Sequence, residues 1–100
     1  MNDIDVSKIT TFYDENFDRG LFETLDPHNI DISIWDVSNV TNMNSMFYGC
    51  EYFNSDLSNW DVSNVENMRY MFFGCKNFTC DLNRWDVSKV KDMNYMFSGC

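Results

Sequence analysis

Positive charge and long apolar runs are both scarce in this sequence of 100 residues. Seven Lys and Arg residues are outnumbered by sixteen Asp and Glu, which gives a net charge of −9. Binding to a phosphate backbone requires a concentrated basic surface, so this balance argues against nucleic acid and anionic membranes as partners. A transmembrane helix needs about 18 or more consecutive apolar residues, and no such run is present. We therefore predict that no segment inserts into a membrane.

The sequence also lacks the pattern of a secretory signal. Such a signal begins with basic residues followed by an apolar core, whereas this chain opens with Asp3 and Asp5. We expect no export signal in the chain, and the sequence alone assigns it no location.

Histidine is almost absent as well, which bears on catalysis. His28 is the single histidine, and it lies in the turn-like segment Asp26-Pro27-His28-Asn29 with no Cys or second His beside it. A serine nucleophile needs a base and an orienting group, and no base other than His28 is apparent. We interpret His28 as an exposed turn residue, and we predict no catalytic residues, no cofactor and no enzyme activity.

The sequence is instead rich in apolar and aromatic side chains. Hydrophobic residues make up 44% of the chain and aromatic residues 17%, which is too much for a disordered acidic tail. A chain of this length is expected to form a single domain.

Tryptophan marks a repeat with a period of 25 residues. Trp35, Trp60 and Trp85 are equally spaced, and Asp, Val, Ser, Met, Phe, Gly and Cys positions recur with them. Fifteen positions are identical between the units 31–55 and 56–80, which excludes a chance match.

The two ends of the chain differ from these full units. The third copy, 81–100, is incomplete. Residues 1–30 match the pattern poorly, and we predict that they form an atypical N-terminal capping unit, because a repeat array must cover its apolar ends.

Each unit carries the signals of one short strand and one short helical turn. Residues 35–37 alternate apolar and acidic side chains, as a half-buried strand does. Residues 43–50 place apolar side chains at i, i+3, i+4 and i+7, between Asn42, a favourable N-cap, and Gly49, a favourable helix end.

One unit is too small to fold alone. Its nine apolar side chains contribute about 1.5 to 3 kcal/mol each when buried, whereas ordering its backbone costs on the order of 25 to 50 kcal/mol. Stability must therefore arise between units, which predicts a solenoid whose parallel strands lie about 4.8 Å apart.

Cysteines follow the same period. Cys50, Cys75 and Cys100 are too far apart in the sequence for a zinc finger, and we expect them to form a column of small buried thiols. The expected separation does not exclude a disulfide between neighbours. Cys80 lies outside the column and is predicted to be the most reactive free thiol, although no neighbour clearly lowers its pKa.

Aspartates form two further columns, which would place like charges side by side unless each is compensated. An Asx turn, in which the carboxylate accepts the backbone N–H two residues ahead, would provide that compensation. A calcium site is the alternative, because stacked carboxylates supply hard oxygen ligands, but the glycine-rich turns of known calcium-binding repeats are missing. The columns are Asp31, Asp56 and Asp81, and the calcium candidates Asp36, Asp61 and Asp86.

Other positions differ from unit to unit and are predicted to face outward. Exposed Tyr, Phe and Arg side chains are the types that anchor protein interfaces. The candidates for binding a partner are Tyr48, Arg69, Tyr70, Phe73 and Tyr95. A tolerant surface with no partner is the alternative explanation.

The blocks Trp-Asp-Val-Ser, Met-Phe and Gly-Cys recur in register three times over residues 31–100. They closely resemble the repeat of BspA-like bacterial surface proteins, which also occurs in lipoproteins of wall-less bacteria. The resemblance implies a leucine-rich-repeat-like solenoid, displayed on the cell surface and used for adhesion or protein binding, without catalytic residues.

Together these features favour a non-enzymatic adhesion or interaction module that presents its outer side chains to a protein partner. Two alternatives stay open. An uncovered last unit would expose an unpaired edge, so either the chain is a fragment of a longer array or, if the 100 residues are the natural product, the edge is covered by self-association end to end or through the C-terminal unit. The aspartate columns would instead make the chain a calcium-dependent surface binder.

Overall fold

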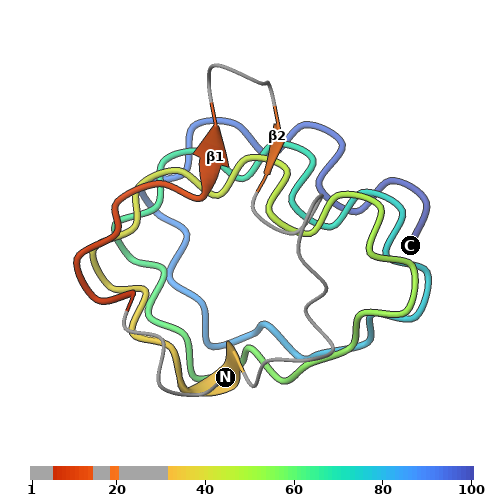
Figure 1. Ribbon diagram of the computed structural model, residues 1–100, viewed down its shortest axis with the longest axis horizontal. Helices are drawn as coiled ribbons and strands as arrows, with labels where there is room; N and C mark the ends of the chain where they lie inside the picture. Colours follow the sequence, from red (N-terminus) through yellow and green to blue (C-terminus); the bar gives the residue numbers. More distant parts are fainter. Residues whose placement is uncertain (1–5, 15–18, 21–31) are drawn as a thin grey trace.

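The computed structural model describes residues 6–14, 19–20 and 32–100 (Figure 1). Most of the predicted capping unit, residues 1–30, lies outside this part of the chain, and so does His28.

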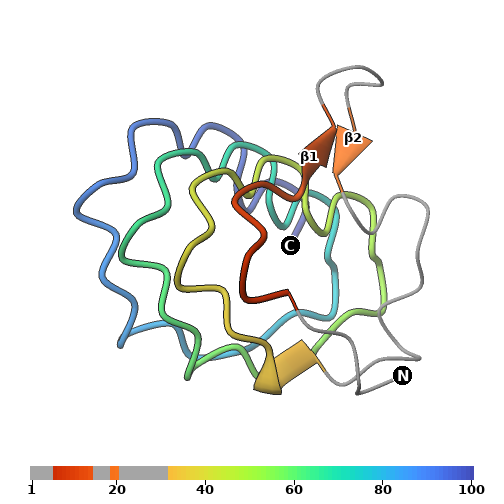
Figure 2. The same ribbon diagram turned by 60° about the vertical axis from the view of Figure 1, so that its left-hand side comes forward.

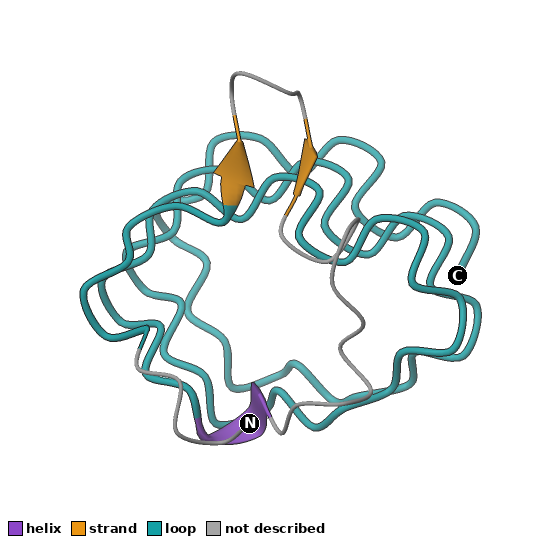
Figure 3. Cartoon of the chain, in the orientation of Figure 1, coloured by secondary structure: helices purple, strands orange, loops and turns teal. Residues whose placement is uncertain are grey.

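Among the described residues, regular secondary structure is limited to three short elements. Strands β1 (Tyr13–Asp14) and β2 (Arg19–Gly20) pair antiparallel, with Tyr13 opposite Gly20. The 3-10 turn η3 (Ile32–Ile34) follows, and its first residue is fully buried. Turns and loops make up nearly all of the remaining described chain (Figure 3).

Equivalent residues of successive units lie side by side (Figures 1 and 2). Parallel bridges join Asn42 to Asn67 and Asn67 to Asp92, and Thr11 joins Asn42 in the same way. Residues 25 positions apart in the sequence are therefore neighbours in adjacent units.

The helix predicted between Asn42 and Gly49 does not form, because this segment is a series of turns. Ser45 has a φ of 59°, and its equivalents Tyr70 and Tyr95 have values of 57° and 60°. A residue in this left-handed region cannot continue a right-handed helix.

The backbone donors that a helix would use internally are bonded to the next unit instead. Four N–H groups of the first unit each donate to the carbonyl 24 residues ahead, at 2.8–2.9 Å. The donors are Met43, Ser45, Phe47 and Gly49, and the acceptors, in the same order, are Asn67, Arg69, Met71 and Phe73. The same bonds, at 2.9–3.1 Å, run from residues 68, 70, 72 and 74 to residues 92, 94, 96 and 98. We call this set of bonds the backbone ladder.

The strand predicted over residues 35–37 is also absent. The N–H of Trp35 donates to the carbonyl of Ile32 at 3.1 Å, and the carboxylate of Asp36 accepts the N–H of Ser38 at 3.0 Å. These local bonds turn the chain at the point where a strand would need bonds to a neighbour. Parallel pairing occurs further along, at Asn42.

The apolar side chains of the repeat form one continuous core. Phe72 stacks between Phe47 and Phe97, with ring centroids 5.5 and 5.6 Å apart and interplanar angles of 6° and 7°. The methionines of the first two units are 0% exposed: Met43, Met46, Met68 and Met71. Packing of a residue on its equivalent is therefore present in the core for Phe47, Phe72 and Phe97.

Burial decreases in the last unit. Met68 and Phe72 are 0% exposed, whereas their equivalents Met93 and Phe97 are 43% and 50% exposed. The difference arises because each unit is covered by the one that follows it.

Within the described residues, no helix is long and apolar enough to span a bilayer.

Candidate functional site

A groove with a volume of about 740 Å³ lies across the three units and β1. All five residues predicted to bind a partner line it: Tyr48, Arg69, Tyr70, Phe73 and Tyr95. Tyr13, Asn44 and Ser45 complete the lining, and we call this feature the aromatic groove.

Two columns of stacked rings form one wall of the aromatic groove. Tyr70 and Tyr95 stack with ring centroids 5.2 Å apart, and Tyr48 and Phe73 stack at 4.9 Å. The two columns meet edge to face, since Tyr70 lies at 71° to Tyr48 and at 74° to Phe73. Such stacked and T-shaped pairs are favourable, so the rings support one another in fixed positions.

The repeat explains why these rings face outward together. Ser45, Tyr70 and Tyr95 occupy the same place in successive units and share the left-handed backbone conformation described above. Because the units stack in register, the tyrosines are brought face to face. Ser45 carries no ring, so the column is only two rings long and the groove continues over a small side chain.

Arg69 supplies the groove's positive charge. Its guanidinium lies 5.1 Å from the ring centre of Tyr70 and 6.0 Å from that of Tyr95, within the range of a cation–π contact. It also forms an ion pair with Asp92 at 3.7 Å. A side-chain hydrogen bond with Tyr70, aided by the charge of Asp92, raises the pKa of Arg69 above its ordinary value.

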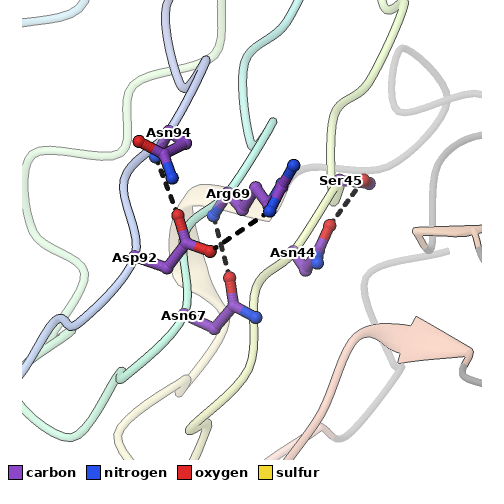
Figure 4. A network of polar contacts seen from close by, with 6 residues as sticks. All are labelled: Asn44, Ser45, Asn67, Arg69, Asp92 and Asn94. Carbon is purple, nitrogen blue, oxygen red and sulfur yellow. Dashed lines mark hydrogen bonds and ion pairs between the residues drawn. The ribbon is translucent and has the colours of Figure 1, made fainter.

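Polar side chains hold the backbone beneath this cation (Figure 4). The Oδ1 atoms of Asn67 and Asp92 accept the N–H groups of Arg69 and Asn94, each at 2.9 Å. The hydroxyl of Ser45 is 2.6 Å from Asn44 Oδ1. Both the backbone N–H and the side chain of Arg69 are therefore held by neighbours, and the same is true of Ser45.

The aspartate column has the local compensation that the Asx-turn prediction required. The Oδ1 atoms of Asp36, Asp61 and Asp86 each accept the N–H of the serine two residues ahead, at 3.0 Å. The side-chain hydrogen bond from Ser63 is the main cause that lowers the pKa of Asp61, against burial and the charges of Asp36 and Asp86, which raise it. These carboxylates therefore act as corners of each unit.

This arrangement does not support the calcium hypothesis. Among the described residues, no group of three or more His, Cys, Asp or Glu side chains is placed to hold a metal ion. One oxygen of each calcium candidate is already bonded to a serine, as described above.

The thiols of Cys75 and Cys80 have little nucleophilic character, because burial raises the pKa of both. Cys75 Sγ donates to the carbonyl of Phe47 at 3.1 Å, and burial raises the pKa of Cys75 to about 12. Burial also raises the pKa of Cys80, whose sulfur accepts the N–H of Leu57 at 3.3 Å. The prediction of Cys80 as the most reactive thiol gains no support, because the environment disfavours its thiolate.

Three lining residues were not among the predicted partner-binding positions. Asn44 and Ser45 occupy positions that vary between units, but neither has an aromatic or charged side chain. Tyr13 precedes the regular repeats and reaches the groove only because β1 lies beside the first unit. No repeat signal in the sequence could have identified it.

Comparison with protein families gives a match over the whole chain. A family described as "Mycoplasma protein of unknown function, DUF285" matches residues 1–100. Neither the curated proteins nor the solved structures gave a match.

Proposed function

Because the chain belongs to the DUF285 family of Mycoplasma proteins of unknown function, we propose its function from its own surface. The chain is a non-enzymatic interaction module that binds a protein partner in the aromatic groove. Its units form a leucine-rich-repeat-like solenoid related to the BspA-like repeat, and its role is adhesion or protein binding.

The observation that carries this proposal is the convergence of the five candidate residues in one cavity. They come from all three units, and two of them, Tyr48 and Tyr95, are 38% and 58% exposed. Rigid aromatic side chains with a polar atom at the tip lose little entropy on binding, which suits them to anchor a partner. Arg69 adds a guanidinium that can donate hydrogen bonds to a carboxylate or carbonyl of the partner.

The test compares proteins captured by immobilised chains from the same protein mixture. The binding variant carries Tyr70→Ser and Tyr95→Ser, and both changes suit the backbone because Ser45 has the same φ at the equivalent place. The matched control is Tyr52→Ser, since Tyr52 is 67% exposed and lies outside the groove lining. A protein retained by wild type and the control but lost with the double variant supports the proposal. Equal capture by all three chains contradicts it.

Self-assembly is the second candidate function. The observation that favours it is the exposure of two large apolar side chains in residues 81–100, Met93 at 43% and Phe97 at 50%. A melting temperature that rises with protein concentration would support assembly, since association stabilises only the folded chain. Thermal unfolding with calcium and with a chelator tests the calcium-dependent alternative, because a chain that binds calcium only when folded must have a higher melting temperature with the ion.

A further inference from the structure

The column of stacked tyrosines stops where the second unit meets the first. Tyr95 stacks on one face of Tyr70, and the place for a ring on the opposite face belongs to Ser45. Among the described residues, no ring stacks on that opposite face, because the other ring contacts of Tyr70 are edge to face. Ser45 lines the groove and is only 7% exposed, so it forms part of the groove's floor.

The second unit shows how a ring is held at this place in the repeat. The ring of Tyr70 meets that of Phe73, three residues later, at 74° with centroids 5.5 Å apart. Tyr48 lies three residues after Ser45, and its ring is stacked on that of Phe73 at an angle of 7°. A ring above Ser45 would therefore stack on Tyr70 and meet Tyr48 edge to face, the two arrangements that aromatic pairs prefer.

Arg69 leaves the centre of this ring face open. Its guanidinium is 5.1 Å from the ring centre of Tyr70 and 6.0 Å from that of Tyr95. A cation centred over the opposite face of Tyr70 would lie much farther from Tyr95, since the two ring centres are themselves 5.2 Å apart. The cation therefore lies beside the stack, where Asp92 of the third unit also contacts it.

The groove has a local charge opposite in sign to that of the chain. Arg69 is the only charged side chain among the residues that line it, whereas the chain has a net charge of −9. A guanidinium has five N–H donors, and the carboxylate of Asp92, at 3.7 Å, is beyond direct hydrogen-bond distance. The side chain of Arg69 is 40% exposed, so a carboxylate from a partner can reach it.

We propose that the segment bound in the aromatic groove carries an aromatic side chain next to an acidic one. The ring occupies the place above Ser45 and continues the column on Tyr70, and the carboxylate accepts hydrogen bonds from Arg69. An aliphatic side chain could fill the same space, but it would gain neither the stacking nor the edge contact. This inference rests on the proposed function, because it names the chemistry of the protein segment that the groove binds.

The test is an NMR titration of the complete chain with a peptide of the sequence Gly-Ser-Phe-Glu-Ser-Gly, blocked at both ends. A phenyl ring stacked on Tyr70 should move the ring protons of Tyr70 upfield by its ring current. Those of Tyr52, which is 67% exposed and lies outside the groove lining, should not move.

Two matched peptides separate the ring from the charge. With Leu in place of Phe, the upfield shift should disappear and the Kd should rise about threefold to tenfold. With Gln in place of Glu, the upfield shift should remain and the Kd should rise about twofold to fivefold. These comparisons use the wild-type chain, so they do not depend on the folding of a variant.

A variant of the chain tests the position of the ring. Ser45→Tyr places the chain's own ring where the ring of the partner is proposed to lie, and it should abolish the upfield shift. The control is Asn59→Tyr, which adds a ring at an exposed position outside the groove lining and should bind the peptide as wild type does.

Equal affinity for the Phe and Leu peptides, equal affinity for the Glu and Gln peptides, or no upfield shift with the Phe peptide would each overturn the proposal. The capture experiment with Tyr70→Ser and Tyr95→Ser decides the proposed function separately. Capture that depends on these tyrosines, without a preference for the Phe peptide, would leave the groove as a binding site for a partner of other chemistry. Capture that is independent of them would remove both proposals.

Discussion

The indole nitrogen of Trp60 donates to the backbone carbonyl of Ile32, 2.9 Å away and 28 residues earlier in the chain. Trp85 makes the same bond to Leu57 at 2.9 Å. Trp60 and Trp85 therefore each pack in the core of their own unit and fix the position of the unit before it. The 25-residue spacing of Trp60 and Trp85 therefore corresponds to the same bond between successive units.

Removing this bond should weaken the stack. Trp60→Phe keeps an aromatic ring but removes one of the two donors to the buried Ile32 carbonyl, which keeps the N–H of Trp35, so the free energy of unfolding should fall by about 0.5 to 1.5 kcal/mol. Urea denaturation measures the change. Trp85→Phe is the matched control and should cost less, because Trp85 is only half-buried. An equal or larger cost at Trp85 would contradict the burial argument.

Gly74 tests the backbone of the turns. Its φ is 75°, and an added Cβ would lie 3.7 Å from Gly49 Cα, which is ordinary contact. Gly74→Ala should therefore cost only the strain of the left-handed conformation, about 1 to 2 kcal/mol. Gly49→Ala, with a φ of 74° and no atom within 4 Å of the added Cβ, should cost a similar amount by thermal or urea unfolding. A much larger loss at Gly74 would show that the units pack more tightly there than described.

The serine-bonded aspartates predict the acid behaviour of the chain. Hydrogen bonds from serines lower the pKa values of Asp56, Asp61 and Asp86 below their ordinary value of 3.8. Because the folded pKa is below the unfolded one, this contribution to stability is present above the unfolded pKa and is lost as pH falls through the folded pKa. The urea midpoint should therefore fall as the pH is lowered through and below 3.8.

Ser63→Ala supplies the control for this pH dependence. Without its hydroxyl, the pKa of Asp61 should rise toward the ordinary value, as followed by NMR of the carboxyl carbon, while the pKa of Asp86 should change little. A pKa of Asp61 that is unaffected by the substitution would exclude Ser63 as the main cause.

The thiols should differ in their access to alkylating reagents. Cys75 is fully buried and its pKa is raised to about 12, so iodoacetamide at neutral pH should label it only when the chain unfolds. Cys100 is exposed and should be labelled in the folded chain, more slowly than a thiol in a small peptide because partial burial of its sulfur raises its pKa. Mass spectrometry after a timed reaction separates the two. Rapid labelling of Cys75 in the folded chain would contradict its place in the core.

Sequence periodicity predicted the stacking partners but not the local conformation. Positions such as Phe47 and Phe72 could be paired from their spacing alone, because any stacked repeat brings equivalent residues together. The helix expected after Asn42 was wrong, because apolar spacing cannot distinguish a helix from turns whose donors are bonded to a neighbouring unit. The left-handed φ of Ser45, Tyr70 and Tyr95 has no signal in these residue types, since glycine is the residue expected there.

The candidate site was predictable to a similar extent. Tyr70 and Tyr95 could be assigned to one surface because they occupy the same position in successive units, and because that position is variable, with Ser45 in the first unit. The edge-to-face contact with Tyr48 and Phe73 could not, since it depends on how the turns between them orient two different columns. Tyr13 required the three-dimensional path of the segment before the repeats.

The most direct test of the aromatic groove is Ser45→Tyr, which fills the groove without removing any residue proposed to bind. Its backbone already has the conformation of Tyr70, so the new ring can extend the existing column, and because Ser45 is only 7% exposed, any cost of fitting the ring should appear as a lower melting temperature. The measurement is the affinity of this variant for a partner captured by the wild-type chain, with the melting temperature recorded alongside. The account predicts a folded chain that has lost the partner. A folded variant that binds as tightly as wild type would contradict it.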